Sequence, residues 1–146
     1  MFKSEAFFTK EQQEEITAAV RRAELKTSGE IRLFIDSKCK GDVLDRAAFI
    51  FEHLEIHKTV KRDGVLFYLA IDHRKFAILG DAGINAVVKP DFWDEIKKEM
   101  LTHFSRAEFT KGLVKGIEMA GEALEKYFPH EENDTNELAD EIVFGK

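Results

Sequence analysis

Hydrophobic positions are densest between Val65 and Leu79, and the rest of the chain is organised around this stretch. Two apolar runs, Val65–Ile71 and Phe76–Leu79, are separated by the polar step Asp72–Lys75. An apolar run without polar alternation is typical of a strand that is covered on both faces. A short polar step that begins with Asp and His favours a tight turn. The pattern therefore predicts a β-hairpin at the centre of the fold.

A strand and a helix are predicted ahead of the hairpin. In residues 30–36, Ile31, Leu33 and Ile35 alternate with a mixed set of side chains, as in a strand with one apolar face. Because a helix between two strands makes a crossover, residues 30–36 are expected to run parallel to Val65–Ile71. The crossover helix is capped by Asp42, and its predicted apolar stripe is Leu44, Ala47, Ala48, Phe51 and Leu54.

Helical spacing marks the remaining elements. Thr9–Gln12 is a capping box, which begins a helix from about Lys10 to Leu25. After the hairpin the pattern predicts a short helical turn at Ile84–Val88, a helix from Pro90 or Asp91, and a last helix over Phe109–Phe128. A fourth strand is expected from residues 2–8 or from the tail. The order predicts an α/β protein, a three-layer α/β/α sandwich around a small mixed β-sheet.

Length and charge divide the chain into two parts. The chain has 146 residues, of which 44% are hydrophobic and thirteen are Phe, enough to form one core. Residues 130–146 carry six acids and one lysine, and so hold most of the net charge of −6. We assign residues 1–129 to a single domain and residues 130–146 to an acidic C-terminal extension, in which Ile142–Phe144 either dock or fray. The acidic balance argues against nucleic-acid binding.

Cysteine content and hydropathy indicate in which cellular compartment the protein is expected. Cys39 is the single cysteine, so an internal disulfide is excluded, and we interpret it as an incidental thiol in a Lys-flanked loop. No apolar run approaches the roughly 18 residues that a membrane span needs. Residues 1–10 lack the long apolar stretch of a signal peptide. The sequence predicts a soluble, cytoplasmic protein that does not itself span a membrane.

Four short motifs follow one another along the predicted domain: Thr27–Ile31, Asp63–Leu66, Asp72–Lys75 and Gly80–Ile84. In this order they resemble the TPM domain family, over about residues 9–128. The resemblance implies an α/β/α sandwich, binding of divalent cations, calcium above all, and weak acid phosphatase activity in some members. Other members act in photosystem repair or membrane-protein assembly. This chain looks like the stand-alone, soluble type. Its glycine turn departs from the family's Gly-x-Gly-Leu-Glu, because Asn85 stands in place of the acid.

The hairpin geometry groups acidic residues at two edges of the sheet. Glu30, Asp63 and Asp81 are expected at one edge, and Asp36 and Asp72 at the opposite edge. Carboxylates that converge in loops suit a hard cation such as Ca2+ or Mg2+, which prefers oxygen ligands. The second edge has a separate argument, since ligands favour the carboxyl ends of parallel strands. The alternative is that Asp63 and Asp81 are turn residues and that Glu30 pairs with a nearby Arg or Lys.

Two functions from different classes follow, and a third stays open. The leading hypothesis is a calcium- or magnesium-binding TPM-type module that acts with membrane or envelope protein partners. The alternative is a weak metal-dependent acid phosphatase, in which metal-bound water near Asp81 is the nucleophile and His57, Arg62 or Arg74 supplies acid or charge. The third is an interaction protein without a ligand, which docks through Ile142–Phe144.

Overall fold

The computed structural model describes residues 7–131 and 141–145. Their elements, in chain order, are α1 (Lys10–Glu24), β1 (Glu30–Asp36), α2 (Val43–His53), the 3-10 helix η2 (Ile56–Lys58), β2 (Gly64–Ala70), β3 (Lys75–Gly80), α3 (Ala82–Asn85), α4 (Phe92–Phe104), α5 (Phe109–Tyr127) and β4 (Val143–Phe144).

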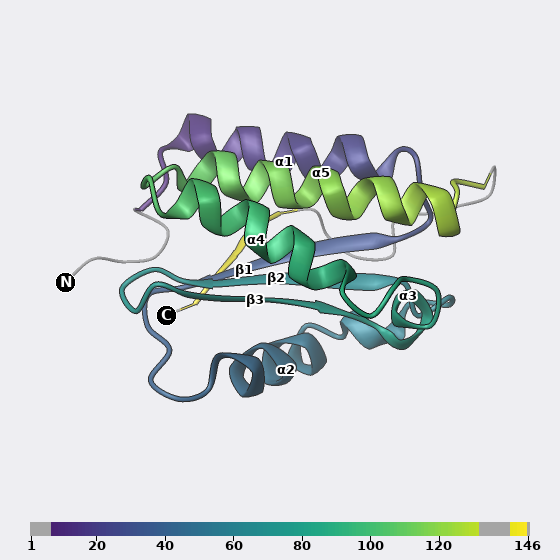
Figure 1. Ribbon diagram of the computed structural model, residues 1–146, viewed down its shortest axis with the longest axis horizontal. Coiled ribbons are helices and arrows are strands. Elements are labelled where there is room, and N and C mark those ends of the chain that lie inside the picture. The colour runs from purple at the N-terminus through teal and green to yellow at the C-terminus, as the bar shows by residue number, and fades with distance from the viewer. Residues whose placement is uncertain (1–6, 132–140, 146) are drawn as a thin grey trace.

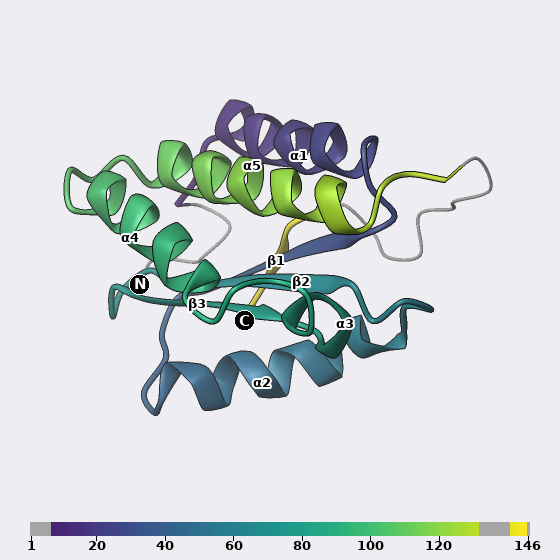
Figure 2. The same cartoon turned by 45° about the vertical axis from the view of Figure 1, so that its right-hand side comes forward.

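The sheet lies between two layers of helix. Its strand order is β3-β2-β1-β4, with β1 parallel to β2 and β4, and β2 antiparallel to β3. Figures 1 and 2 show α1, α4 and α5 on one face of the sheet and α2 on the other. The predicted α/β/α sandwich around a small mixed sheet is therefore confirmed, as are the central hairpin and the parallel crossover.

Each face of the sheet packs on its own core cluster. Ile31, Leu33 and Ile35 belong to the cluster under α1, α4 and α5. Phe34 and Tyr68 belong to the smaller cluster under α2. All seven residues of β2 are buried, because helices cover this strand on both faces. This double burial explains why the sequence shows a continuous apolar run there.

The buried face of α2 differs from the predicted stripe. Ala47 and Ile50 are its buried residues, whereas Leu44 is 49% exposed and Ala48 is exposed too. At about 100° per residue, the face that meets the sheet is centred between Ala47, Ile50 and Leu54. The inclusion of Leu44 and Ala48 was wrong because the stripe was drawn without Ile50, which rotates the buried face away from both.

The C-terminal tail supplies the fourth strand. Val143 and Phe144 of β4 pair with Phe34 and Ile35 of β1, so the docked alternative for this segment holds. The other candidate, residues 2–8, lies largely outside the described residues. The division of the chain at residue 129 stays a prediction, although a strand from the extension completes the sheet.

Candidate functional site

Three buried acids surround Gly64 at the end of the sheet where β1 and β2 begin. Glu30 is the register partner of Gly64, Asp63 precedes it, and the Asp81 N–H donates to its carbonyl at 2.9 Å. Their exposed fractions are 2% for Glu30, 1% for Asp63 and 5% for Asp81. The predicted grouping at one edge is thus present in the backbone, and all three side chains are withdrawn from solvent.

Asp81 is held by an arginine. Arg62 Nε and Nη2 donate to the two Asp81 carboxylate oxygens at 2.7 Å each, and the Ala82 N–H also donates to Oδ1 at 2.7 Å. The hydrogen bond and the charge of Asp81 raise the pKa of Arg62. Arg62 itself has a left-handed backbone (φ 54°) and its side chain is 51% exposed. The pair joins a buried carboxylate to a guanidinium that is open to water.

The glycine turn closes on the same arginine. The Gly83 N–H donates to the Arg62 carbonyl at 2.9 Å, and a Cβ at Gly83 would collide with that oxygen. Asn85 donates to the Gly80 carbonyl at 2.7 Å and accepts from Trp93 Nε1 at 2.8 Å. This turn therefore fixes the backbone around Arg62, and Asn85 acts as a structural bridge to α4.

Asp63 is embedded in backbone and hydroxyl contacts. Its Oδ2 accepts from Ser28 Oγ at 3.0 Å, and its N–H donates to Thr59 Oγ1 at 3.2 Å. Its carbonyl accepts from the Glu30 N–H at 3.3 Å. Ser28 and Thr59 thus belong to this site. Sequence reasoning missed them because neither hydroxyl belongs to a charge pattern.

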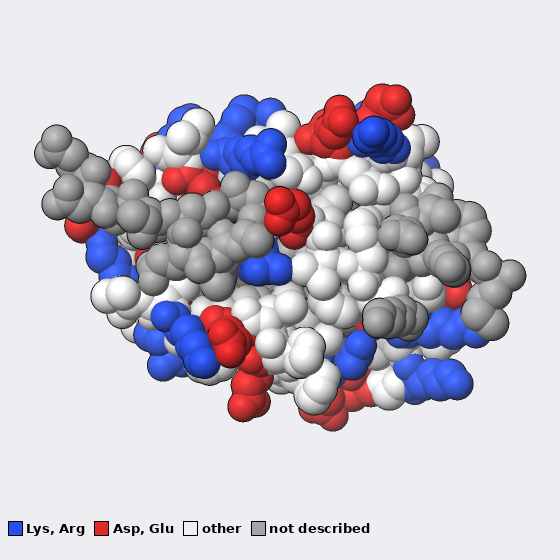
Figure 3. Space-filling view, turned by 180° about the vertical axis from the view of Figure 1, so that it is seen from behind, with Lys and Arg blue, Asp and Glu red and all other residues white. Residues whose placement is uncertain are grey.

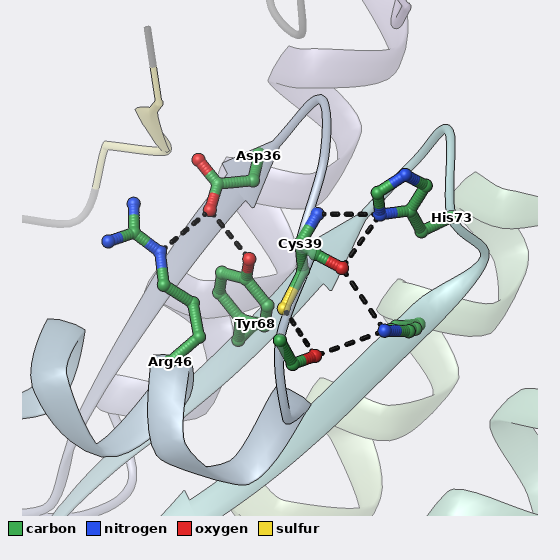
Figure 4. Close-up of polar contacts among 7 residues, drawn as sticks. Asp36, Cys39, Arg46, Tyr68 and His73 are labelled. Atoms are coloured by element: carbon green, nitrogen blue, oxygen red, sulfur yellow. Dashed lines mark hydrogen bonds and ion pairs between the residues drawn. The ribbon is translucent and has the colours of Figure 1, made fainter.

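The opposite end of the sheet holds a second buried aspartate. Figure 4 shows Tyr68 and Arg46 converging on Asp36, whose Oδ2 accepts from the Tyr68 hydroxyl at 2.6 Å and from Arg46 Nε at 3.1 Å. The Arg46 guanidinium also lies over the rings of Phe34 and Phe49, 5.8 and 5.7 Å from their centroids. Asp36 is 4% exposed and Tyr68 is 1% exposed.

Burial and the neighbouring charge set the protonation of this cluster. Burial, followed by the hydrogen bond to Asp36, raises the pKa of Tyr68 well above its usual value. Burial opposes the charge of Arg46, but the hydrogen bond and charge of Asp36 outweigh it, so the pKa of Arg46 is also raised. Tyr68 is therefore a neutral donor at physiological pH, and Asp36 receives two donors on one oxygen.

The second predicted edge does not gather its two acids in one buried place. Asp36 points inward to Tyr68 and Arg46, whereas Asp72 lies exposed in the hairpin turn, where its backbone N–H donates to the Ser37 carbonyl at 2.7 Å. In the part of the chain that the structure describes, no group of three His, Cys, Asp or Glu side chains is placed to hold a metal ion.

The loop after β1 surrounds the single cysteine with polar contacts. Cys39 is 5% exposed, and its Sγ lies 3.6 Å from the Gly41 carbonyl. His73 Nδ1 accepts from the Cys39 N–H at 3.0 Å, and Lys75 Nζ donates to the Cys39 and Gly41 carbonyls at 3.1 and 3.0 Å (Figure 4). His73 and Lys75 of the hairpin thus secure this loop, and the thiol is withdrawn from solvent.

Surface charge and helix hydropathy indicate which kinds of partner the chain could bind. Seen from behind, in Figure 3, acidic and basic side chains are interspersed around an uncharged area. A basic stripe of the kind that tracks a nucleic-acid backbone is not what this face presents. Among the described residues, no helix has both the length and the apolar character to cross a membrane.

Comparison with known proteins gives one family and several structures. The model of the TPM domain matches residues 1–123. The NMR structure of BA42 from the psychrophilic bacterium Bizionia argentinensis shares 44% identity, covers 99% of this chain and all of its own, and superposes with a TM-score of 0.91. No curated protein matches the chain.

Two more distant structures share the fold. The N-terminal domain of a protein from P. gingivalis is 18% identical, with coverage of 86% of this chain and 83% of its own and a TM-score of 0.67. The N-terminal domain of cg2496 from Corynebacterium glutamicum is 14% identical, with coverage of 80% and 74% and a TM-score of 0.65.

Proposed function

We propose, since this chain belongs to the TPM domain family, that it is a module that binds calcium or magnesium and acts with membrane or envelope protein partners. The observation that carries the proposal is the burial of Glu30, Asp63 and Asp81 around Gly64. Burying a carboxylate is costly unless it is paired, so three at one end of a sheet indicate a place that attracts cations.

The chemistry of the donors suits a hard cation. Asp63 and Asp81 offer carboxylate oxygens, Ser28 offers a hydroxyl, and the backbone carbonyls of Lys61 and Arg62 lie against Gly83 of the glycine turn. Calcium and magnesium both prefer such oxygen donors. A metal ion bound here would supply fixed positive charge to the buried acids.

The Arg62 guanidinium lies on the Asp81 carboxylate, where a cation would have to bind. Both Asp81 oxygens accept from this guanidinium, so a cation at this end has to take its place. The Arg62 side chain is half exposed, so it can turn into solvent when a cation takes its place on Asp81. Arg62 is thus an internal competitor of the metal ion, which predicts weak binding and sets the design of the test.

The test is thermal unfolding of the chelated protein, with and without millimolar calcium or magnesium. An ion that binds only the native state stabilises it by RT ln(1 + [L]/Kd), about 2.7 kcal/mol at a hundredfold excess over Kd. We expect the ion-dependent rise in Tm to grow in Arg62→Gln, which removes the competitor, and to vanish in Asp81→Asn.

Asp91→Asn is the matched control, because Asp91 is an exposed acid at the start of α4 with no side-chain capping bond. It should keep the parent's ion response. The proposed cation site is wrong if calcium or magnesium raises the Tm of Arg62→Gln no more than that of the parent, and raises the Tm of Asp81→Asn by as much as that of the parent.

A weak metal-dependent acid phosphatase is the second candidate. The observation in its favour is the positive charge of Arg62 beside Asp81, since phosphoryl transfer needs such charge near the reacting group. His57 lies on η2, in the segment between α2 and β2 that also contains Arg62. Its Nδ1 is buried and has no hydrogen-bond partner among the described residues. Hydrolysis of p-nitrophenyl phosphate by the parent, lost in Arg62→Gln and His57→Gln, would favour this candidate over the binding module.

A further inference from the structure

The helices α1 and α5 form an outer layer of the molecule. They lie side by side in both ribbon views, with the sheet on one side of them (Figures 1 and 2). The ring of Phe7, just before α1, contacts that of Phe109 at the start of α5. Near the other end, a Cβ on Gly121 of α5 would lie 2.8 Å from the Cβ of Ala23 of α1. The two helices therefore run in the same direction, and their outward sides form one surface that the proposed function does not use.

A groove of about 340 Å³ between the second halves of the two helices has rims of opposite charge. The basic rim consists of Arg22 and Lys26 at the end of α1, and the acidic rim consists of Glu118, Glu122 and Glu125 of α5. All five residues are exposed, and none of them forms an ion pair within the part of the chain that the structure describes. The charges of both rims are therefore open to a partner.

The charges change places toward the starts of the two helices. There α1 carries the exposed Glu11 and Glu15, and α5 carries the exposed Lys111 and Lys115. Glu15 and Lys111 line the same hollow, so they lie at one level of the layer. At each end of this surface, α1 and α5 thus carry opposite charges, and the sign on each helix is reversed from one end to the other.

We propose that this surface of α1 and α5 is a self-association site, at which a second copy of the chain binds about a two-fold axis that runs along the groove. Such an axis places α1 of each copy over α5 of the other, parallel to it and at the same level. The basic rim of each copy then meets the acidic rim of the other, and the charges toward the helix starts match as well. Complementary charges of this kind fix the register of an interface and disfavour other arrangements. The surface contains none of the acids proposed to bind a cation.

The size of the surface sets the expected strength of the dimer. The 15 residues of α1 span about 22 Å, and two helices that are each about 10 Å wide offer about 450 Å² per copy. The total of about 900 Å² is below the roughly 1,200 Å² at which stable interfaces begin, so the dimer belongs to the weak class. Because its contacts join exposed charges, salt should dissociate it.

The test is the molecular mass of the full-length chain in sedimentation equilibrium at millimolar protein concentration. We expect a dimer at about 0.01 M NaCl and a monomer at about 1 M, between which the Debye length falls from about 30 Å to about 3 Å. An acidic variant, Arg22→Glu with Lys26→Glu, and a basic variant, Glu118→Lys with Glu122→Lys, should each dimerise at least about tenfold more weakly, because like charges then face each other. All four positions are exposed, so both variants are expected to fold.

An equimolar mixture of the two variants should restore the dimer, because the acidic α1 of one then meets the basic α5 of the other. An arrangement with α1 on α1 would not be restored in this way. The matched control is Asp45→Lys with Glu52→Lys, which has the same net charge as the basic variant but changes exposed residues of α2, on the other side of the sheet. It should dimerise like the parent. A parent that stays monomeric at low salt, variants that dimerise as well as the parent, or a mixture that stays monomeric would each overturn the proposal.

Discussion

Both ends of the sheet hold a buried aspartate against an arginine, but the two pairs are built differently. At one end, Arg62 reaches Asp81 from solvent through two hydrogen bonds. At the other end, Asp36 accepts from the buried Tyr68 hydroxyl as well as from Arg46, whose side chain is 38% exposed and lies over the rings of Phe34 and Phe49.

The difference separates a pair that can open from one that is part of the core. Among the described residues, Arg62 is the one side chain that donates to the Asp81 carboxylate, and it is half exposed, whereas Asp36 keeps the hydrogen bond from the buried Tyr68 hydroxyl even when Arg46 leaves. A ligand that needs a carboxylate therefore finds Asp81 more available than Asp36. The comparison predicts three mutational effects of decreasing size.

The largest effect is expected from Asp36→Ala. This change leaves the Tyr68 hydroxyl, in a residue that is 1% exposed, without its acceptor, and leaves Arg46 without its partner. Leaving a buried donor without its acceptor costs about 1–3 kcal/mol in the free energy of unfolding, and we expect a loss toward the upper end of this range. Urea unfolding measures it. A loss below about 1 kcal/mol would mean that the cluster contributes no more than an exposed ion pair.

A smaller effect is expected from Tyr68→Phe, and it depends on pH. Because the pKa of Tyr68 is raised in the folded chain, the phenol stays protonated there while it ionises in the unfolded chain above about pH 10. The stability from this difference is complete below pH 10 and is lost as the pH rises further.

The measurement is urea unfolding of parent and Tyr68→Phe at pH 9 and pH 11. At pH 11, one unit above the usual tyrosine pKa, the parent should lose about 1.4 kcal/mol more than the variant. The variant is its own control, because every other ionisable group is the same in the two proteins. Equal losses in the two proteins would show that Tyr68 ionises in the folded chain.

The fold could be predicted from sequence because its signals are local. The apolar run Val65–Ile71, the polar step after it and the alternation around Leu33 each predict an element by themselves, and the crossover helix between the strands then predicts their parallel pairing. The grouping of Glu30, Asp63 and Asp81 followed from the same register. The hairpin, the parallel pairing and the position of these three acids at one end of the sheet are therefore confirmed, whereas their role as cation ligands stays a prediction.

The side-chain partners could not be predicted in the same way. Asp36 finds Arg46 because α2 lies across the sheet at a particular rotation, and the predicted stripe of α2 already missed that rotation. Tyr68 lies in an apolar run, where its aromatic ring fits the predicted buried strand. Nothing in the sequence indicates that its hydroxyl donates to Asp36. Arg62 comes shortly before β2 and Asp81 directly after β3, so both lie at the open end of the hairpin. The strand register therefore brings this pair together, and it could have been predicted from the sequence.

The smallest effect on stability is expected from Arg62→Gln in the absence of metal ions. Arg62 is half exposed, so solvent screens its attraction to Asp81, and the loss should be smaller than that of Tyr68→Phe. At about 1 M NaCl, where the Debye length is about 3 Å, the difference between parent and Arg62→Gln should shrink further, while the cost of Asp36→Ala persists. Parallel urea unfolding in low and high salt measures both. A large, salt-independent loss in Arg62→Gln would show that the two ends of the sheet are equally locked, and would remove the reason to expect that a cation can take the place of Arg62 on Asp81.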